Sequence, residues 1–183
     1  MIDVRLHYRL DRNLFFADDA QPEALLRVAH ERWAADFSYS GSAPGRFTCG
    51  VVSAGCILGS WDGHSQRVPA GSCICWDARP RILRADPEDP PECWLVTLRS
   101  RRIETMARRC LGLSCGGLPL HDAHAPLTLL QTMHREAREG GPFTAELVLA
   151  QVPVLLWTLR RALLPTPDVH SRAQARYQEI RRL

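Results

Sequence analysis

The sequence predicts an α+β fold in which a small β-barrel or sandwich is followed by a helical segment. Short runs rich in β-branched residues alternate with turn signals through residues 46–98, as is typical of a compact all-β unit. After residue 99 the apolar residues recur at helical spacing instead. The length of 183 residues fits one domain with a helical addition. A hydrophobic fraction of 45% and a charged fraction of 23% exclude a disordered chain, a collagen or a bare coiled coil.

The strands expected in the first half are recognised by the turns between them. Residues 46–60 (RFTCGVVSAGCILGS) are rich in β-branched side chains, and the Asp-Gly within 61–64 (WDGH) predicts a hairpin. A Pro-Ala-Gly turn at 69–71 precedes the short strand CICW, and RPRILRA contains another strand. The proline-rich acidic stretch 86–92 (DPEDPPE) predicts a surface loop, and 93–98 (CWLVTL) is the clearest strand.

The chain before residue 46 is compatible with more than one structure. Residues 22–37 (PEALLRVAHERWAADF) fit a helix beginning at Pro22, and they also fit two short strands. We expect strands after residue 27. Residues 1–20 could form an edge strand or a mobile arm.

Three helices are expected in the second half, at 100–111, 125–138 and about 143–164. The third is apolar nearly all round, although Pro153 should kink it. A helix that is apolar on every side must be buried on every side, and a domain of this size covers one face. We therefore expect a homodimer, in which the other face of this helix meets a second copy of the chain. The residues expected to form that contact are Leu149, Val152, Leu155, Leu156 and Leu159.

Charge is unevenly distributed along the chain. The net charge is +3, all 23 basic residues are arginine, and the absence of lysine excludes both a catalytic lysine and a P-loop. Residues 160–183 carry six arginines against Asp168 and Glu179, a net +4, which leaves −1 for the remainder. The main body therefore has no basic face for nucleic acid. Residues 165–169 are expected to form a stiff linker, and 171–183 a basic helix.

No secretory signal opens the chain, and its longest uncharged apolar window, 147–159, spans 13 residues. A membrane helix needs about 20 apolar residues, so we expect a soluble, cytoplasmic protein with no membrane partner. The seven cysteines are an odd number, which argues against a disulfide framework. Most of them are expected to be small buried hydrophobes.

The order of these elements resembles the N-terminal half of AraC/XylS-type transcription regulators. The matching segments are VSAGCILGSWDGHSQRVPAGSCICWDARPR, CWLVTLRSRRIETMARRCLGL and APLTLLQTMHREAREG. Residues 68–72 resemble the family's proline-glycine turn, and residues 96–103 resemble its strand-to-helix junction. The resemblance covers roughly residues 25–183.

This resemblance implies a cupin-like barrel that senses a small effector and a helical pair that dimerises. DNA would be bound only through a C-terminal pair of helix-turn-helix motifs, for which this chain has no room, so we expect a truncated chain or a natural fragment. The chain then divides into a sensing part at 1–98, a dimerisation part at 99–164, and a linker with the start of a DNA-binding domain at 165–183. We expect neither enzymatic activity nor a cofactor.

An effector inside the barrel would contact aromatic and polar groups on the strands. The candidates are Tyr39, Arg46, Trp61, Trp76 and Trp94, with Arg46 as a partner for a carboxylate effector. A packed interior without a cavity stays open as an alternative, in which the module only dimerises or binds another protein.

Metal and thiol chemistry define the competing classes. Enzymatic cupins bind metal through two histidines one residue apart, and here His64 stands alone, which disfavours a cupin-type metalloenzyme. Four candidate ligands lie within fifteen residues, at Cys110, Cys115, His121 and His124, although their spacing is looser than in most structural zinc sites. A cysteine-based metal or redox sensor would use these residues or the Cys73-x-Cys75 pair, whose side chains share one face of a strand.

Overall fold

The computed structural model describes the backbone of residues 8–14 and the full residues 23–42, 45–61, 63–79, 81–112 and 115–165. Within them the strands are β1 (Tyr8–Leu14), β2 (Ala24–Trp33), β3 (Ser38–Gly41), β4 (Phe47–Ala54), β5 (Cys56–Trp61), β6 (His64–Pro69), β7 (Ser72–Trp76), β8 (Arg81–Ala85), β9 (Glu92–Arg99) and β10 (Gly116–Pro119). The helices are α1 (Arg101–Leu111), α2 (His124–Glu139) and α3 (Thr144–Ala162). The linker and basic tail expected after residue 165 lie outside the described residues.

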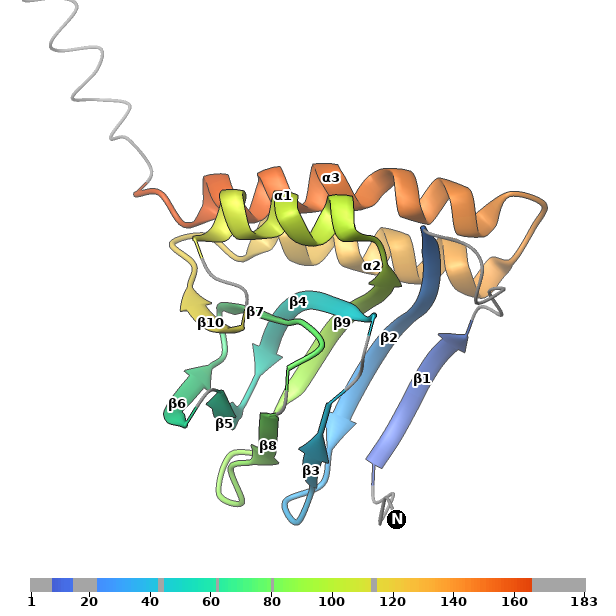
Figure 1. The fold of residues 1–183 in the computed structure, drawn as a ribbon. Helices are drawn as coiled ribbons and strands as arrows, with labels where there is room; N and C mark the ends of the chain where they lie inside the picture. The colour runs from blue at the N-terminus through green and yellow to red at the C-terminus, as the bar shows by residue number, and fades with distance from the viewer. Residues whose placement is uncertain are drawn as a thin grey trace, which may run out of the picture.

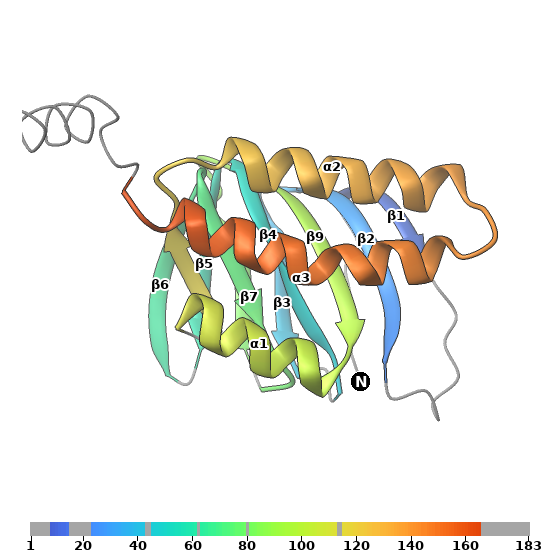
Figure 2. The ribbon, with the colours of Figure 1, turned by 90° about the horizontal axis from the view of Figure 1, so that it is seen from above.

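The strands form two antiparallel sheets stacked beneath a layer of helices (Figure 1). The larger sheet has six strands in the order β1-β2-β9-β4-β7-β10, and the smaller has four in the order β3-β8-β5-β6. Figure 2 shows all three helices across one face of the larger sheet, with α3 between α1 and α2. The described strands thus form a two-sheet sandwich, and the closed barrel expected from the sequence is corrected to this arrangement.

Both faces of the central strands are covered, which explains why they read as continuous apolar runs. In β9 the side chains of Cys93 and Leu95 face the smaller sheet, while Val96 and Leu98 face the helices. The molecule therefore has two cores on opposite faces of one sheet. One lies between the sheets and includes Ile57, Ile74, Leu83 and three tryptophans. The other lies under the helices and includes several thiols.

The two sheets are joined at one edge by a side chain. The amide of Gln66 in β6 donates to the carbonyl of Gly117 at 2.7 Å and accepts from the Gly117 amide at 3.0 Å. A Cβ on Gly117 would lie 2.4 Å from Val68 Cγ1, so the close approach of β10 to β6 requires glycine here. The sequence predicted the helices on either side of β10 but not the strand itself, because consecutive glycines favour loops more often than strands.

Residues 24–33 form one strand, so the alternative of a helix beginning at Pro22 is wrong and the expectation of strands is confirmed. The β2 strand pairs with β9 on one side and with the edge strand β1 on the other. The three expected helices are confirmed to within two residues at each end. Helix α1 begins at a Ser100 cap, whose hydroxyl accepts from the Ile103 amide at 3.1 Å, and ends at Gly112 in the left-handed region.

The helices and the larger sheet share one continuous core, which joins residues on both sides of the expected boundary near residue 99. Helix α3 contributes most to it, through Val148, Val152, Leu155, Leu156 and Leu159, all with 0% exposure. Sheet and helices are thus held together by apolar burial. The division into sensing and dimerisation parts stays a prediction.

Candidate functional site

A buried arginine occupies one end of the space between the two sheets. In β8 the side chains of Arg81, Leu83 and Ala85 point inward, while Ile82 and Arg84 are exposed. Arg81 is 7% exposed. The alternation of the strand therefore places a charged residue where an apolar one would ordinarily lie.

The Arg81 guanidinium lies between two aromatic rings. Its central carbon is 5.2 Å from the ring centre of Tyr39 and 5.3 Å from that of Trp76, close enough for cation–π attraction. Its Nη1 donates to the backbone carbonyls of Asp77 and Arg79, each at 3.3 Å, and its buried Nε has no partner. Burial lowers the pKa of Arg81, but an arginine remains protonated at neutral pH. A charged group is thus held between rings with one donor unused.

Trp61 presents a second unused donor beside the first. Trp61 lies directly opposite Arg81 in the β5–β8 pair and is 6% exposed. Its ring covers Gly59, where a Cβ would come within 1.9 Å of the indole. The buried indole Nε1 has no hydrogen-bond partner. Two neighbouring inward positions therefore leave two buried N–H groups unsatisfied, which is uncommon in folded proteins.

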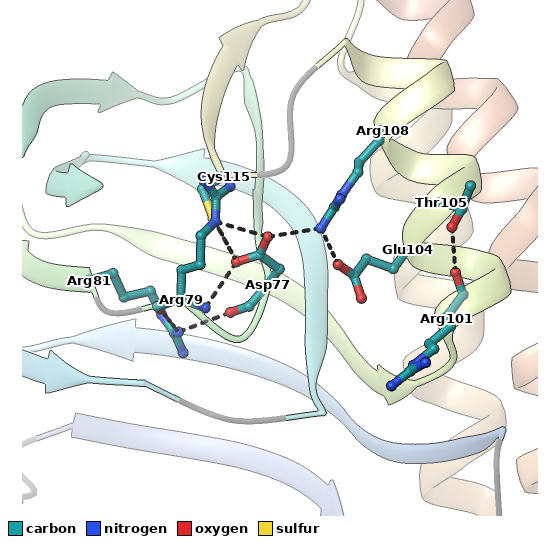
Figure 3. A network of polar contacts seen from close by, with 8 residues as sticks. All are labelled: Asp77, Arg79, Arg81, Arg101, Glu104, Thr105, Arg108 and Cys115. Carbon is teal, nitrogen blue, oxygen red and sulfur yellow. Dashed lines mark hydrogen bonds and ion pairs between the residues drawn. The ribbon is translucent and has the colours of Figure 1, made fainter. Parts of the chain in front are cut away.

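Asp77 connects this end of the sandwich to helix α1 (Figure 3). Its side chain accepts from the backbone N and Nε of Arg79 at 3.0 and 3.1 Å, from Sγ of Cys115 at 3.2 Å, and from Nη2 of Arg108 at 3.4 Å. Burial raises the pKa of Asp77, but the hydrogen bonds from Arg79 and Cys115 outweigh it and hold that pKa below its ordinary value of 3.8. Arg108 belongs to α1 and also pairs with Glu104. The carboxylate of Asp77 thus links strand and helix.

A second buried carboxylate between the sheets has its partners in place. Glu31 is 3% exposed and accepts from Nη1 of Arg27 at 2.6 Å and from Nε1 of Trp33 at 3.0 Å. Nε of Arg27 donates to the Thr97 hydroxyl, which is also hydrogen-bonded to the Thr48 hydroxyl. The contrast with Arg81 shows that this interior ordinarily satisfies its polar groups.

Three of the five expected effector contacts meet in this place, and two do not. Tyr39, Trp61 and Trp76 belong to the core between the sheets. Arg46 is exposed before β4, and Trp94 faces the helices, where it stacks on His30 at 4.0 Å. Arg46 and Trp94 are therefore corrected: neither lines the interior. Arg81 was not among the residues predicted from the sequence. Ile82 and Leu83 are both apolar and adjacent, so the sequence does not show which alternate residues of β8 point inward.

The four expected metal ligands do not converge. Cys110 is buried in the core beneath the helices, Cys115 is bonded to Asp77, and His121 and His124 are exposed. Among the residues that the structure describes, no group of three or more histidine, cysteine or acidic side chains could hold a metal ion.

The thiols are poorly suited to redox sensing. Burial raises the pKa of Cys49 to about 12 and that of Cys73 to about 11. Burial also raises the pKa values of Cys75, Cys93 and Cys115. The thiolate is the reactive form, and burial holds these thiols in the protonated form at neutral pH.

The residues expected to form the dimer contact lie mostly inside the protomer. Val152, Leu155, Leu156 and Leu159 are fully buried against the sheet, and Leu149 is partly buried against the same core. The exposed large apolar residues of α3 are Leu147, Val154 and Trp157, the last with 61% exposure. Because the helix is apolar all round, the sequence did not show which stripe faces outward. The homodimer itself stays a prediction, but its contact would have to use the exposed residues of α3 and not the buried ones.

No protein-family model and no curated protein sequence matches the chain. Solved structures do resemble it, among them YhaK from Escherichia coli, with a TM-score of 0.42 and 13% identity over 50% of this chain. This match spans 45% of YhaK, less than half of its length. The Cupin_2 domain of an XRE family transcriptional regulator from Enterobacter cloacae matches 52% of this chain and 98% of its own, with a TM-score of 0.39 and 14% identity.

A predicted oxalate decarboxylase from Thermotoga maritima also resembles the chain, with a TM-score of 0.40, 12% identity and coverage of 49% of this chain and 80% of its own. The presence of an enzyme among these structures overturns the expectation that the chain is not one, although it does not show activity. These structures, one of them described as a Cupin_2 domain, resemble part of the antiparallel sandwich with its three helices. No described helix is long and apolar enough to cross a membrane.

Proposed function

We propose that this chain is the sensing domain of a transcription regulator, and that it binds a small effector between its sheets. The observation that carries the proposal is the polar connection from that interior to the helical layer. Arg81 lies among three aromatic residues and donates to the carbonyl of Asp77, and the carboxylate of Asp77 accepts from Arg108 on α1. A ligand beside Arg81 would therefore be connected to helix α1 through two successive hydrogen bonds, from Arg81 to Asp77 and from Arg108 to Asp77.

This connection gives the effector a route for regulation. A ligand changes a conformational equilibrium only by contacting the two states differently. A ligand that draws Arg81 away from the Asp77 carbonyl would alter the contact between Asp77 and Arg108. Helix α1 packs against α3, so a shift of α1 would reach the outer surface of the helical layer. An effector signal would then be read as a change in how that surface associates.

We propose that this outer surface forms a homodimer. Alternating steps of four and three residues separate the positions on the outer side of α3 and its ends, namely Phe143, Leu147, Ala150, Val154, Trp157, Arg161 and Leu164. This is the spacing of a coiled-coil seam, and α1 and α2 flank α3 on both sides (Figure 2). The unpartnered stripe therefore suits another helix of the same kind.

Charge favours an antiparallel pairing of the two α3 helices. The acidic Glu146 lies near the beginning of the helix, and Arg160 and Arg161 lie at its end. A two-fold axis between Pro153 and Val154 would bring Glu146 of one copy beside Arg161 of the other, and Ala150 beside Trp157. A parallel pairing would place like charges together, which is unfavourable.

The finer form of the proposal is an AraC/XylS-type regulator, in which DNA is bound by a domain joined after this one. Its support is the order of elements, with a sandwich followed by helices that offer an unpartnered seam. The net +4 of residues 160–183 supports a nucleic-acid-binding part near the C-terminus.

The proposal is tested by measuring ligand binding and self-association on the same samples. A library of small organic acids, sugars and aromatic compounds is screened by NMR for shifts of the Trp61 and Trp76 indole resonances. For a binder, sedimentation should show a dimer dissociation constant that the ligand changes several-fold. The Arg108→Gln variant should bind the ligand but lose that change, while Arg109→Gln, an exposed neighbour on α1, should behave as the wild type. No binder at these indoles, or a monomer at all concentrations, would contradict the proposal.

A further inference from the structure

We propose that the effector is a small organic carboxylate, bound by Nε of Arg81 and Nε1 of Trp61. This inference rests on the proposed function, because it assumes that the effector lies between the sheets. It adds the chemical class of the ligand and the two atoms that select it.

The first argument is a missing counter-ion. Among the described residues no carboxylate forms an ion pair with Arg81, although it is 7% exposed. Asp77 offers Arg81 only its backbone carbonyl, because its carboxylate is engaged by Arg79, Cys115 and Arg108. Burying a charge without an opposite charge is costly. The negative charge of Asp77 acts on Arg81 without a direct ion pair, and it raises the pKa of Arg81 less than burial lowers it. An anionic ligand would supply the direct counter-charge that the described residues do not.

Arg27 shows what a satisfied arginine looks like in the same interior. Its Nη1 lies 2.6 Å from Oε1 of Glu31, and its Nε is bonded to Thr97. The positive charge of Arg27 also repels Arg81. This repulsion lowers the pKa of Arg81, but less than burial does. Arg27 is thus paired with a carboxylate of the chain, whereas Arg81, which is more deeply buried, forms no ion pair with any described residue.

The second argument is the pair of unused donors. Trp61 and Arg81 are direct partners in the β5–β8 register, and directly opposed side chains in a sheet are neighbours. Each carries a buried N–H without an acceptor. A carboxylate has two oxygens that accept hydrogen bonds and none that donates. It can therefore accept from donors carried by two paired residues, and the bond to the guanidinium would be charge-assisted.

The third argument concerns what surrounds the donors. The faces of the Tyr39 and Trp76 rings lie beside the guanidinium, and this attraction uses none of its N–H groups. Nη1 is engaged by two backbone carbonyls, which leaves the buried Nε for a ligand. Beyond the rings the interior is apolar, with Ile57, Ile74 and Leu83. The site therefore suits a carboxylate with an apolar body. A water molecule could accept from one donor but would leave the charge of Arg81 unbalanced.

The test compares an anion with its uncharged counterpart. Hexanoate and hexanamide are titrated separately into the wild-type chain, and the Trp61 and Trp76 indole resonances are followed by NMR. We expect hexanoate to bind at least tenfold more tightly than hexanamide, and the Trp61 Nε1 proton to move downfield as it gains an acceptor. Sodium phosphate serves as the inorganic anion and should bind at least tenfold more weakly than hexanoate.

Variants separate the two donors. Arg81→Gln should weaken hexanoate binding about 10- to 100-fold, the effect of losing a hydrogen bond between charged groups. Trp61→Phe replaces the indole by a smaller aromatic ring without Nε1 and should weaken binding about three- to tenfold. Arg84→Gln removes an outward-facing arginine of the same strand and should change nothing. The Trp94 indole resonance, on the other face of the sheet, reports that each variant is folded.

Each outcome bears on the inference. Equal affinity for hexanoate and hexanamide, equal affinity for phosphate, or unchanged hexanoate binding in folded Arg81→Gln would overturn the carboxylate assignment. If hexanamide or another neutral compound still moves the Trp61 and Trp76 resonances, the proposed effector site stands and only the ligand class is wrong. If no compound moves them, both proposals fail.

Discussion

The two faces of the six-stranded sheet have different chemistry although they share the same strands. The face under the helices is lined by aliphatic side chains and thiols, and its core runs without interruption into α3. The face toward the smaller sheet combines Trp33, Trp76 and Leu95 with the polar Glu31, Thr48 and Thr97, and Arg81 of the smaller sheet lies opposite it. The first face holds the fold together mainly by apolar burial. The second gives up part of that stabilisation to polar groups, which points to a role in recognition.

The largest effect should come from the face under the helices. Leu155→Ala removes a side chain that is fully buried between α3 and the sheet and should lower the free energy of unfolding by about 2–5 kcal/mol. The matched control is Leu147→Ala on the same helix, whose side chain is 51% exposed and should cost less than about 0.5 kcal/mol. Urea denaturation followed by circular dichroism measures both. Equal losses would mean that α3 is not packed as described.

A smaller loss is expected between the sheets. Glu31→Gln keeps the shape of the side chain but removes the charge that pairs with Arg27. We expect a loss of about 1–3 kcal/mol in the free energy of unfolding, because buried donors lose a charged acceptor. Glu92→Gln removes the charge of a more exposed carboxylate, which pairs with Arg32 and contacts His30, and should cost about 0–1 kcal/mol. If Glu31→Gln were neutral, the interior between the sheets would be wetter than the structure indicates.

The link between the two regions should depend on pH. The pKa of Asp77 is below its ordinary value of 3.8 in the folded chain, so its ionised form stabilises the fold above that value. This contribution is lost as the pH falls through the lowered pKa. Asp77→Asn should therefore cost about 1–3 kcal/mol at pH 7, and the difference from the wild type should shrink below about pH 4. A difference that stays constant from pH 7 to pH 2 would show that the charge of Asp77 is not what matters.

The smallest effect on stability is expected on the outer side of the helical layer. Trp157→Glu changes a residue with 61% exposure and should alter the free energy of unfolding of the monomer, measured at dilutions where the chain does not associate, by about 0.5 kcal/mol or less. The same change should prevent self-association in sedimentation experiments, since it places a charge in the proposed seam. Thr105→Glu, on the exposed side of α1, is the control. A dimer that persists in Trp157→Glu would move the interface elsewhere.

The sequence predicted which segments form strands better than it predicted the face of the sheet to which each side chain points. CWLVTL was recognised as a strand, but both faces of β9 are covered, so no alternation showed that Trp94 points to the helices. Trp61 and Trp76 point between the sheets, although the residues next to them in the sequence resemble those next to Trp94. The direction of each tryptophan was set by pairing across the sheet, which adjacent residues do not reveal.

The same limit explains what was missed at the candidate site. Arg81 enters the interior because its register with β5 places it opposite Trp61, a contact between residues twenty positions apart. In α3 the apolar residues surround the helix, so the buried stripe through Leu155 could not be told from the exposed stripe through Val154. In both cases long-range packing selected one of two patterns that the local sequence allowed.

The five tryptophans offer the most direct test of the difference between the two regions. Trp33, Trp61 and Trp76 lie between the sheets, Trp94 lies under the helices, and Trp157 is exposed on α3. Nitrogen-15-labelled indole groups can be followed together during titration of the wild-type chain with hexanoate. We predict that the Trp61 and Trp76 resonances shift with a common saturation curve while Trp94 stays unchanged. A shift of Trp94 with Trp61 and Trp76 unchanged would contradict the assignment of recognition to the interior between the sheets.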